Sequence, residues 1–394
     1  MQLRVSRDCC CLHTRTHLNM PRLDGYFIFL LCGLSSISVA DFPVPSEYPP
    51  FSWDTVPVFC HMCKPQGLFN DTELDFIKRF AMVTIEKGQG LNQSGYAEEK
   101  MIAAGMQIKK ANSSIWTLFY MNAILDWPFF KLHDIMLKNP DYWIKHDNGT
   151  AVKFSGDSSF PQPANGMLGF NQSNPNVRKM FTSDCVNATR SKAFNGCFID
   201  RANWALDIYN ANNTRALHGV SRARVKELAD GQVKLLEELQ TGVTSSGLIM
   251  AKDVGRKAGF TDWPYVNSIF LSDCYCCSDS CADDIEAAIN ATKRKQLLQC
   301  HVNGNLNSQD QFTFALATFL VAAGEHSYFA YSHGWFLEGY GLKWWPEYNK
   351  PLGPPAGPAK RTGSVYERSF ASGTHVWLDI KQKKANITWA GDIN

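Results

Sequence analysis

The stretch at residues 195–203 reads NGCFIDRAN. Its apolar run, Cys197, Phe198 and Ile199, ends at an acid, Asp200. An apolar run with turn residues before it and a helical pattern after it is typical of a strand buried on both faces of a parallel sheet. Catalytic and binding groups collect at the C-terminal ends of such strands. Asp200 is therefore the first candidate for a catalytic residue, and a helix-capping or loop-anchoring role is the alternative.

Short apolar runs alternate with helical patterns along most of the chain. The runs expected to form strands cover residues 56–60, 82–86, 115–121, 167–170, 196–200, 248–251, 269–272 and 298–302. The clearest helical patterns cover residues 71–79, 97–112, 128–138, 176–190, 222–240, 283–294 and 309–323. Eight strand-and-helix units in series predict an α/β fold, a (β/α)8 TIM barrel.

The N-terminal part of the chain has the pattern of a secretory signal. Residues 26–40, YFIFLLCGLSSISVA, are apolar, short for a membrane span, and end in small residues. Cleavage is expected before Asp41, and a start at Met20 would place residues 1–19 upstream of the true start. We therefore expect a signal peptide at residues 1–40 and no membrane segment after its removal.

Two regions depart from the strand-and-helix period. Residues 142–163 are rich in Gly, Ser, Asn and Pro, which predicts a long loop with a hairpin near the barrel mouth. After a Pro-rich bend, residues 365–370, 375–380 and 385–389 alternate apolar and polar side chains, as antiparallel strands do. The expected organisation is a barrel at residues 41–345 and a C-terminal β-sheet extension at residues 346–394.

Secretion is supported by nine Asn-x-Ser/Thr sequons, at Asn70, Asn92, Asn112, Asn148, Asn171, Asn187, Asn212, Asn290 and Asn386. Asn171 follows an apolar run, so we expect it to face the site and to carry no glycan. The formal net charge of +2 and the absence of a basic block argue against nucleic acid as the main partner.

The cysteines are expected to form mostly disulfides. Four of the thirteen precede residue 41, and nine remain in the mature chain, an odd number that leaves at least one thiol over. Residues 60–63 (CHMC) and 272–281 (SDCYCCSDSC) suggest zinc as an alternative, but the spacing of the second cluster and an oxidising compartment favour disulfides. The pairing cannot be derived from the sequence, and no metal or organic cofactor is required.

Nearly every predicted strand ends in polar or charged residues. The candidates are Glu86, Asn122, Asp126, Trp127, Asn171, Asp200, Arg201, Asn203, Lys252, Asp253 and Asn303. A ring of such residues around one barrel mouth would form a shared polar pocket.

Hydrolysis of a glycosidic bond is the chemistry that this pocket suits, because it needs two carboxyl groups. Asp200 is one, and Glu86 ranks first for the other, ahead of Glu325 and Asp253; for Glu86 a structural ion pair is the alternative. Trp127 and Trp335 could stack on sugar rings, and the amides, Asp126, Arg201 and Lys252 could bind hydroxyls. The motifs GxSxG, HExxH and GxxxxGK[ST] are absent from the sequence, so other common mechanisms lack their residues.

The run FNQSNPNVRKMF, residues 170–181, together with NGCFIDRAN resembles the strand-helix-strand segment of glycoside-hydrolase-like TIM barrels. The late segments AAGEHSYF, KWWPEYNKPLGPPAGPA and VYERSFASGTHVWLD are similar to the close of glycosyl hydrolases of that group. The resemblance implies a TIM barrel, an extracellular setting and a carbohydrate substrate, with Asp200 matching the strand-end acid. Related barrels often carry Asp where this chain has Asn171, which leaves room for a sugar-binding protein without catalysis.

The sequence therefore predicts a secreted glycoside hydrolase that uses a two-carboxylate mechanism on a poly- or oligosaccharide. A non-catalytic carbohydrate-binding barrel is the alternative, and a barrel enzyme of other chemistry, such as a lyase, is a third reading. Retention or inversion at the anomeric carbon depends on the separation of the two carboxyl groups, which the sequence does not give.

Overall fold

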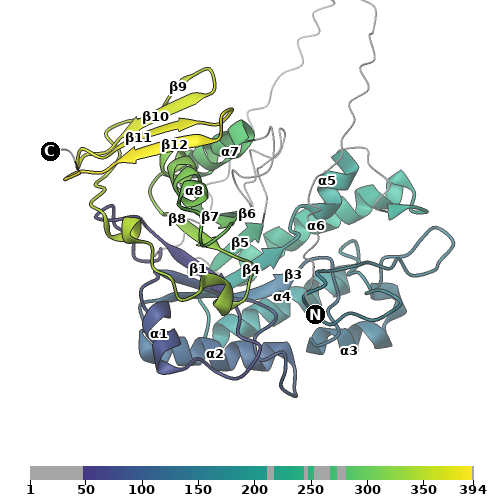
Figure 1. Cartoon of the computed structure of the whole chain (residues 1–394). Helices are drawn as coiled ribbons and strands as arrows, with labels where there is room; N and C mark the ends of the chain where they lie inside the picture. The colour runs from purple at the N-terminus through teal and green to yellow at the C-terminus, as the bar shows by residue number, and fades with distance from the viewer. Residues whose placement is uncertain (1–47, 211–216, 244–246, 253–266, 273–280, 393–394) are drawn as a thin grey trace, which may run out of the picture. The chain divides into compact units, whose positions relative to one another are not determined.

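Eight parallel strands form the centre of the structure, a computed structural model that describes residues 48–210, 217–243, 247–252, 267–272 and 281–392 (Figure 1). The strands are β1 (Phe59–Met62), β2 (Met82–Ile85), β3 (Trp116–Asn122), β4 (Gly196–Asp200), β5 (Leu248–Lys252), β6 (Ser268–Ser272), β7 (Leu297–Asn303) and β8 (Ser327–Ser332). Each strand pairs with the next one in the chain. A bridge between Val58 and Phe329 brings β8 back to β1. The sheet is a near-closed barrel, which confirms the predicted TIM fold.

Helices surround the strands. They are α1 (Asp71–Ile77), α2 (Ala97–Ala111), α3 (Lys131–Lys138), α4 (Pro175–Arg190), α5 (Trp204–Asn210), α6 (Arg222–Val243), α7 (Cys281–Lys293) and α8 (Gln309–Ala322), with short 3-10 helices η1 (Pro140–Tyr142), η3 (Leu337–Tyr340) and η4 (Pro346–Asn349). Side chains cap several of their first turns. Asn70 and Glu73 form a capping box at α1, and Ser308 Oγ accepts a hydrogen bond from the backbone of Gln311 at α8.

One predicted strand is wrong and one real strand escaped prediction. Residues 167–170 lie outside the barrel and form only isolated antiparallel bridges, such as Phe154 with Met167. They belong to the insertion between α3 and α4 and are apolar because they are buried within it; the same insertion contains the predicted hairpin with its Lys145–Ala151 bridge. The eighth barrel strand is instead β8, SYFAYS, whose two serines shorten its apolar run.

A four-stranded antiparallel sheet follows the barrel, as predicted. Its strands are β9 (Lys360–Thr362), β10 (Val365–Ser369), β11 (His375–Asp379) and β12 (Lys384–Thr388), in the spatial order β12-β11-β10-β9. The sheet covers α8 (Figure 1), and for this reason every side chain of α8 from Phe314 to Ala322 is buried. Arg368 of β10 donates hydrogen bonds from Nη1 to the carbonyls of Leu320, Val321 and Ala323 at 2.9, 3.3 and 2.6 Å.

One disulfide joins Cys185 of α4 to Cys197 of β4, the strand that ends in Asp200. The expectation of mostly disulfides fails at Cys60 and Cys63, which are buried thiols. Side chains three residues apart on an extended strand point to opposite faces, so these two cysteines are not placed to bond to each other. Cys274, Cys276 and Cys277, like the predicted signal peptide, lie outside the described residues.

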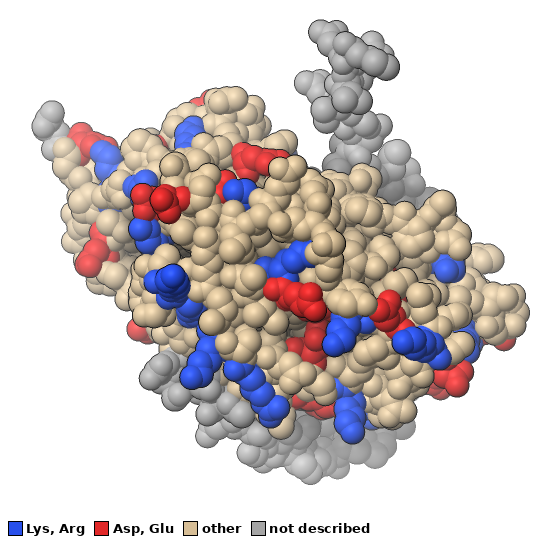
Figure 2. Space-filling model, turned by 90° about the horizontal axis from the view of Figure 1, so that it is seen from below, with Lys and Arg blue, Asp and Glu red and all other residues tan. Residues whose placement is uncertain are grey.

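The surface carries acidic and basic side chains side by side on the face that Figure 2 shows, in keeping with the net charge of +2. Among the described residues, the large exposed apolar side chains are scattered singly along the chain: Leu68, Met106, Leu137 and Leu342. None of the helices in the described ranges is long and apolar enough to cross a membrane.

We predict that Arg368→Met detaches the C-terminal sheet from the end of α8. The variant leaves three backbone carbonyls without their charged donor, and hydrogen bonds to charged groups contribute about 1.5–3 kcal/mol each. We expect urea unfolding to show that the free energy of unfolding falls by at least the contribution of one such bond, about 1.5–3 kcal/mol. Arg190→Met is the matched control, because Arg190 is exposed at the end of α4, and such surface changes stay within about 0.5 kcal/mol. Equal stability of the two variants would contradict the prediction.

Candidate active site

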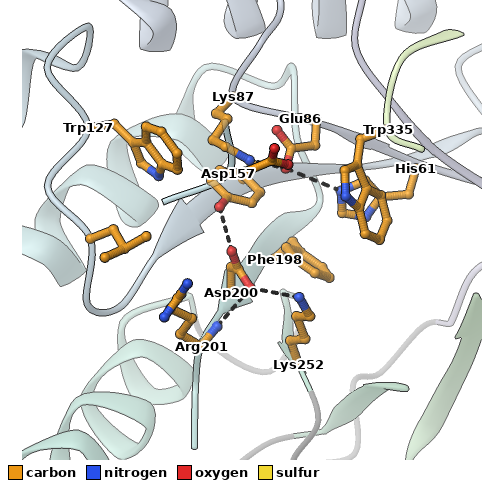
Figure 3. A pocket seen from close by; sticks show the side chains of 12 residues that line it. His61, Glu86, Lys87, Trp127, Asp157, Phe198, Asp200, Arg201, Lys252 and Trp335 are labelled. Carbon is orange, nitrogen blue, oxygen red and sulfur yellow. Dashed lines mark hydrogen bonds and ion pairs between the residues drawn. The ribbon is translucent and has the colours of Figure 1, made fainter. Parts of the chain in front are cut away.

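A cavity of about 140 Å³ lies at the C-terminal ends of the barrel strands (Figure 3). Its walls come from the ends of β1 to β5, from the loop between β3 and α3, from the insertion between α3 and α4, and from the loop after β8. The lining residues are His61, Glu86, Lys87, Tyr120, Leu125, Trp127, Asp157, Phe198, Asp200, Arg201, Lys252 and Trp335. Three acids and the three cations Lys87, Arg201 and Lys252 share this small space, so electrostatics dominate its chemistry.

Asp200, the last residue of β4, receives four donors. Tyr120 Oη and Asn122 Nδ2, both from β3, donate to Oδ2 at 2.7 and 2.8 Å. The backbone nitrogen of Arg201 donates to Oδ1 at 2.9 Å, and Lys252 Nζ of β5 lies 3.1 Å from Oδ1. The side chain keeps 15% of its surface exposed, so the carboxylate remains accessible from the cavity.

The charge state of Asp200 follows from these neighbours. Burial alone would raise the pKa of Asp200, but the positive charges of Lys252 and Lys87 and the hydrogen bond from Tyr120 outweigh burial. The pKa of Asp200 therefore lies well below its ordinary value. An ionised carboxylate of this kind can act as a nucleophile or stabilise a developing positive charge, but it is a poor proton donor.

Glu86, directly after β2, is the second carboxylate of the cavity. Its Oε1 accepts a hydrogen bond from Lys87 Nζ at 2.7 Å and lies 3.9 Å from His61 Nε2. Its Oε2 is buried and has no hydrogen-bond partner within the described part of the chain. Burial raises the pKa of Glu86, whereas Lys87 and His61 lower it and prevail, so the pKa of Glu86 is lowered.

Aromatic rings hold the Lys87 ammonium in place. Its nitrogen lies 4.0 Å from the ring centroid of Phe160, 4.6 Å from that of Tyr120 and 5.1 Å from that of Trp127. A cation close to several ring faces is attracted by their quadrupoles. Glu86 therefore has a counter-ion that is fixed in position. Lys87 is also buried, with only 4% of its surface exposed.

Trp335, in the loop after β8, packs against two buried histidines. Its ring lies 4.8 Å from that of His61 in β1 and stacks on that of His301 in β7 at 4.5 Å. Burial lowers the pKa of both histidines, so their imidazoles are neutral at ordinary pH. Phe198 meets His61 edge-on at 4.6 Å. These rings give the cavity one apolar wall, the kind of surface on which a sugar ring stacks.

The structure places the predicted site residues in three groups. Those that line the cavity are Glu86, Trp127, Asp200, Arg201, Lys252 and Trp335, and Asn122 contacts it through Asp200. Others lie apart and have other partners: Asp126 pairs with His133 at 2.7 Å, Asn203 donates to Asp207 at 2.8 Å, and Asn303 lines a separate open hollow with Asn305 and His333. Asp253 lies outside the described residues.

Glu325 and Asn171 need correction. Glu325 is exposed just before β8 begins, at the end of the barrel opposite to the cavity. Its place was misjudged because β8 was missed. Asn171 follows no barrel strand; it accepts a hydrogen bond from Ser173 Oγ at 2.6 Å and lines a different hollow with Lys145 and Arg224. Neither residue can assist Asp200 in this cavity.

Several lining residues were not predicted from the sequence: His61, Lys87, Tyr120, Leu125, Asp157 and Phe198. The alternation of side chains between the two faces of a strand could have predicted two of them. Tyr120 stands two residues before Asn122, and Phe198 two before Asp200, so each shares the inward face with its polar strand end. Asp157 comes from the irregular insertion, where no such period exists. Within the described ranges, no group of three His, Cys, Asp or Glu side chains could hold a metal ion.

Solved structures of similar fold include several glycoside hydrolases. The glycoside hydrolase domain of PelA from Pseudomonas aeruginosa has 11% identity and a TM-score of 0.43, covering 70% of this chain and 94% of that one. An alpha-amylase from Malbranchea cinnamomea has 10% identity and a TM-score of 0.48, with coverages of 83% and 85%. Isomaltulose synthase from Klebsiella sp. LX3 has 13% identity and a TM-score of 0.46, with coverages of 73% and 66%.

A family model gives the assignment. No curated protein matches this chain in sequence. The model described as Hypothetical glycosyl hydrolase family 15 matches residues 109–374, from within α2 to the C-terminal sheet. The matched part includes Asp200, Arg201, Lys252 and Trp335 but begins after Glu86. Because the match covers more than half of the sequence, the chain belongs to Hypothetical glycosyl hydrolase family 15.

Proposed function

We propose that this protein is a secreted glycoside hydrolase that cleaves a poly- or oligosaccharide in the cavity at the barrel mouth. The observation that carries the proposal is the ionised carboxylate of Asp200 at the end of β4, held by four donors within 3.1 Å and open to the cavity. Membership of a glycosyl hydrolase family supports a carbohydrate substrate. The apolar leader and the sequons support secretion.

Asp200 acts in this proposal on the anomeric carbon. Glycosidic cleavage builds positive charge on the sugar ring, and a fixed carboxylate stabilises it or bonds to it. Four donors occupy the lone-pair sites of the free carboxylate. The longest contact, 3.1 Å to Lys252, is made by a side chain that is 24% exposed. The substrate therefore gains Oδ1 when Lys252 moves aside, while Tyr120 and Asn122 keep Oδ2 in place.

Glu86 acts in this proposal as the proton donor to the leaving oxygen. Glu86 lines the cavity, and its buried Oε2 has no hydrogen-bond partner within the described part of the chain; a buried polar atom without a partner is uncommon in a native structure unless it has a function. Lys87 lowers the pKa of Glu86, so the protonated fraction falls already at acidic pH. The enzyme should consequently work best in acidic solution, where Glu86 is protonated and Asp200 is still ionised.

One observation favours the alternative, a carbohydrate-binding barrel without catalysis. Both carboxylates are paired with lysines, and the pKa of each is lowered. A resting proton donor usually has a raised pKa. In a binding protein, the same two ion pairs would orient hydroxyl groups and transfer no proton.

We predict that Asp200→Asn abolishes hydrolysis. The amide preserves the shape of the side chain but removes the charge that the transition state needs, so we expect release of reducing sugar from a panel of polysaccharides and aryl glycosides to fall by about 10³-fold or more, that is about 4 kcal/mol.

Glu325→Gln is the matched control, since Glu325 is an exposed acid at the other end of the barrel, and its activity should equal that of wild type. Thermal unfolding of both variants checks that they fold. No release by wild type on any substrate, with glycan binding intact, would establish the binding protein instead.

We predict that Lys87→Met shifts the pH profile of kcat/KM. Lys87 lowers the pKa of Glu86; without it the pKa rises, Glu86 stays protonated to higher pH, and the alkaline limb moves upward by about one unit or more. The acid limb, set by Asp200, should move upward too, because Lys87 also lowers the pKa of Asp200, but it should move less, because Lys252 is the larger cause and remains. Lys343→Met is the control, because Lys343 also lies over an aromatic ring, that of Trp345, but outside the cavity. An alkaline limb that stays or moves downward would exclude Glu86 as proton donor.

A further inference from the structure

Arg201 is the one cation among the lining residues that no carboxylate holds within the described part of the chain. Lys252 is committed to Asp200 at 3.1 Å, and Lys87 to Glu86 at 2.7 Å. The hydrogen bonds of Arg201 are made by its backbone nitrogen and oxygen. Figure 3 shows its guanidinium at the cavity, on the side of Asp200 away from Lys252.

The backbone of Arg201 adopts a conformation that a residue with a side chain rarely takes. Its φ is +55°, in the left-handed region, which costs a non-glycine residue about 1 kcal/mol or more. Hydrogen bonds to its backbone hold this conformation, among them one from Trp204 N to Arg201 O at 3.2 Å. Arg201 N donates to Asp200 Oδ1 at 2.9 Å, and Nε2 of the fully buried Gln232 donates to Arg201 O at 2.6 Å.

Gln232 is itself fixed, because its Oε1 accepts a hydrogen bond from the backbone nitrogen of Ala205 at 2.8 Å. The chain therefore turns sharply at the end of β4 and sends the Arg201 side chain to the cavity. Strained backbone that the surroundings impose in this way concentrates at functional sites.

We propose that the substrate carries an anionic group, a carboxylate of a uronic acid or a sulfate ester, and that Arg201 binds it. This inference rests on the proposed function and names the class of substrate. A planar guanidinium offers parallel N–H donors that match the paired oxygens of such a group. A neutral hydroxyl would use only some of these donors and would leave the charge of Arg201 without a counter-charge.

The other charges of the cavity permit an anion beside Arg201. Glu86 and Asp200 each have a lysine, so the two pairs are close to neutral. Asp157 is the remaining lining acid. It is exposed on the insertion, and its Oδ1 accepts a hydrogen bond from the backbone nitrogen of Ser159 at 2.9 Å. Solvent screens its charge far more than that of a buried group. An anionic sugar therefore meets a net attraction at Arg201.

The test measures binding by calorimetry in the full-length wild-type protein, in which Lys87 and Lys252 keep their carboxylates, with thioglycoside-linked probes that resist cleavage. Three matched oligosaccharides serve as probes: an oligouronate, the same oligomer with its carboxyls reduced to alcohols, and a sulfated form of the reduced oligomer. We expect the neutral oligomer to bind more weakly than an anionic one, by about 10- to 100-fold, as for loss of hydrogen bonds to a charged group. The preferred anionic probe identifies the group as carboxylate or sulfate.

Arg201→Gln should lower the affinity for the anionic probe to that for the neutral one and leave neutral binding unchanged. Arg201→Gly guards against misfolding, because glycine adopts positive φ without cost; it should lose the same preference and be no less stable. Arg190→Gln, on the exposed end of α4, should bind like its parent. Equal affinity of the parent for all three probes, or an equal loss for all probes in Arg201→Gln, would overturn the inference.

The outcome also separates this inference from the proposed hydrolase. Arg201-dependent binding of an anionic glycan that wild type never cleaves would keep the inference and overturn catalysis. Cleavage by wild type of neutral glycans alone, with no preference for charge, would keep the hydrolase and overturn the inference.

Discussion

The carboxylate of Asp200 holds three neighbouring barrel strands together at the mouth. Tyr120 and Asn122 reach it from β3, and Lys252 reaches it from β5. A buried charge is tolerated only when donors and a counter-charge replace the water that it has lost. Four donors do so here, and the same contacts lower the pKa of Asp200. Because the charge must be satisfied from both neighbouring strands, the ends of β3, β4 and β5 have to meet in one register, and the cavity takes its shape from that register.

A second ion pair, Glu86 with Lys87, completes the cavity on the β2 side and is built differently. Its cation is held by aromatic rings from β3 and from two loops, so it has little freedom to leave Glu86. The cation beside Asp200, in contrast, is partly exposed. The family match covers Asp200 and Lys252 and begins after Glu86. The two pairs thus differ in how exposed their cations are, 4% for Lys87 and 24% for Lys252.

Much of the fold could be predicted from the sequence because the barrel repeats one local pattern. Strand β4 and its terminal acid stand out, since an apolar run stops at a charge, and the C-terminal sheet shows the period of two. Residues 167–170 were wrongly predicted to be a barrel strand, because an apolar run indicates that residues are buried but not which part of the structure buries them. There they are buried within the insertion. Strand β8 was missed because serine hydroxyls occupy both of its ends. The disulfide, the aromatic rings around Lys87 and the place of Asp157 depend on contacts between distant residues, for which a single sequence holds no local signal.

The end of β4 joins charge stabilisation to substrate recognition through one hydrogen bond. The bond from Arg201 N to Asp200 Oδ1 adds a donor to the carboxylate, and it also fixes the left-handed turn that directs the Arg201 guanidinium to the cavity. The two side chains are consecutive in the chain yet face the same space, which an extended strand would not allow, because neighbouring side chains of a strand alternate between its faces. The strained turn is the structural condition for both charges to act on one sugar, and its free-energy cost is met by Gln232 from the core beneath.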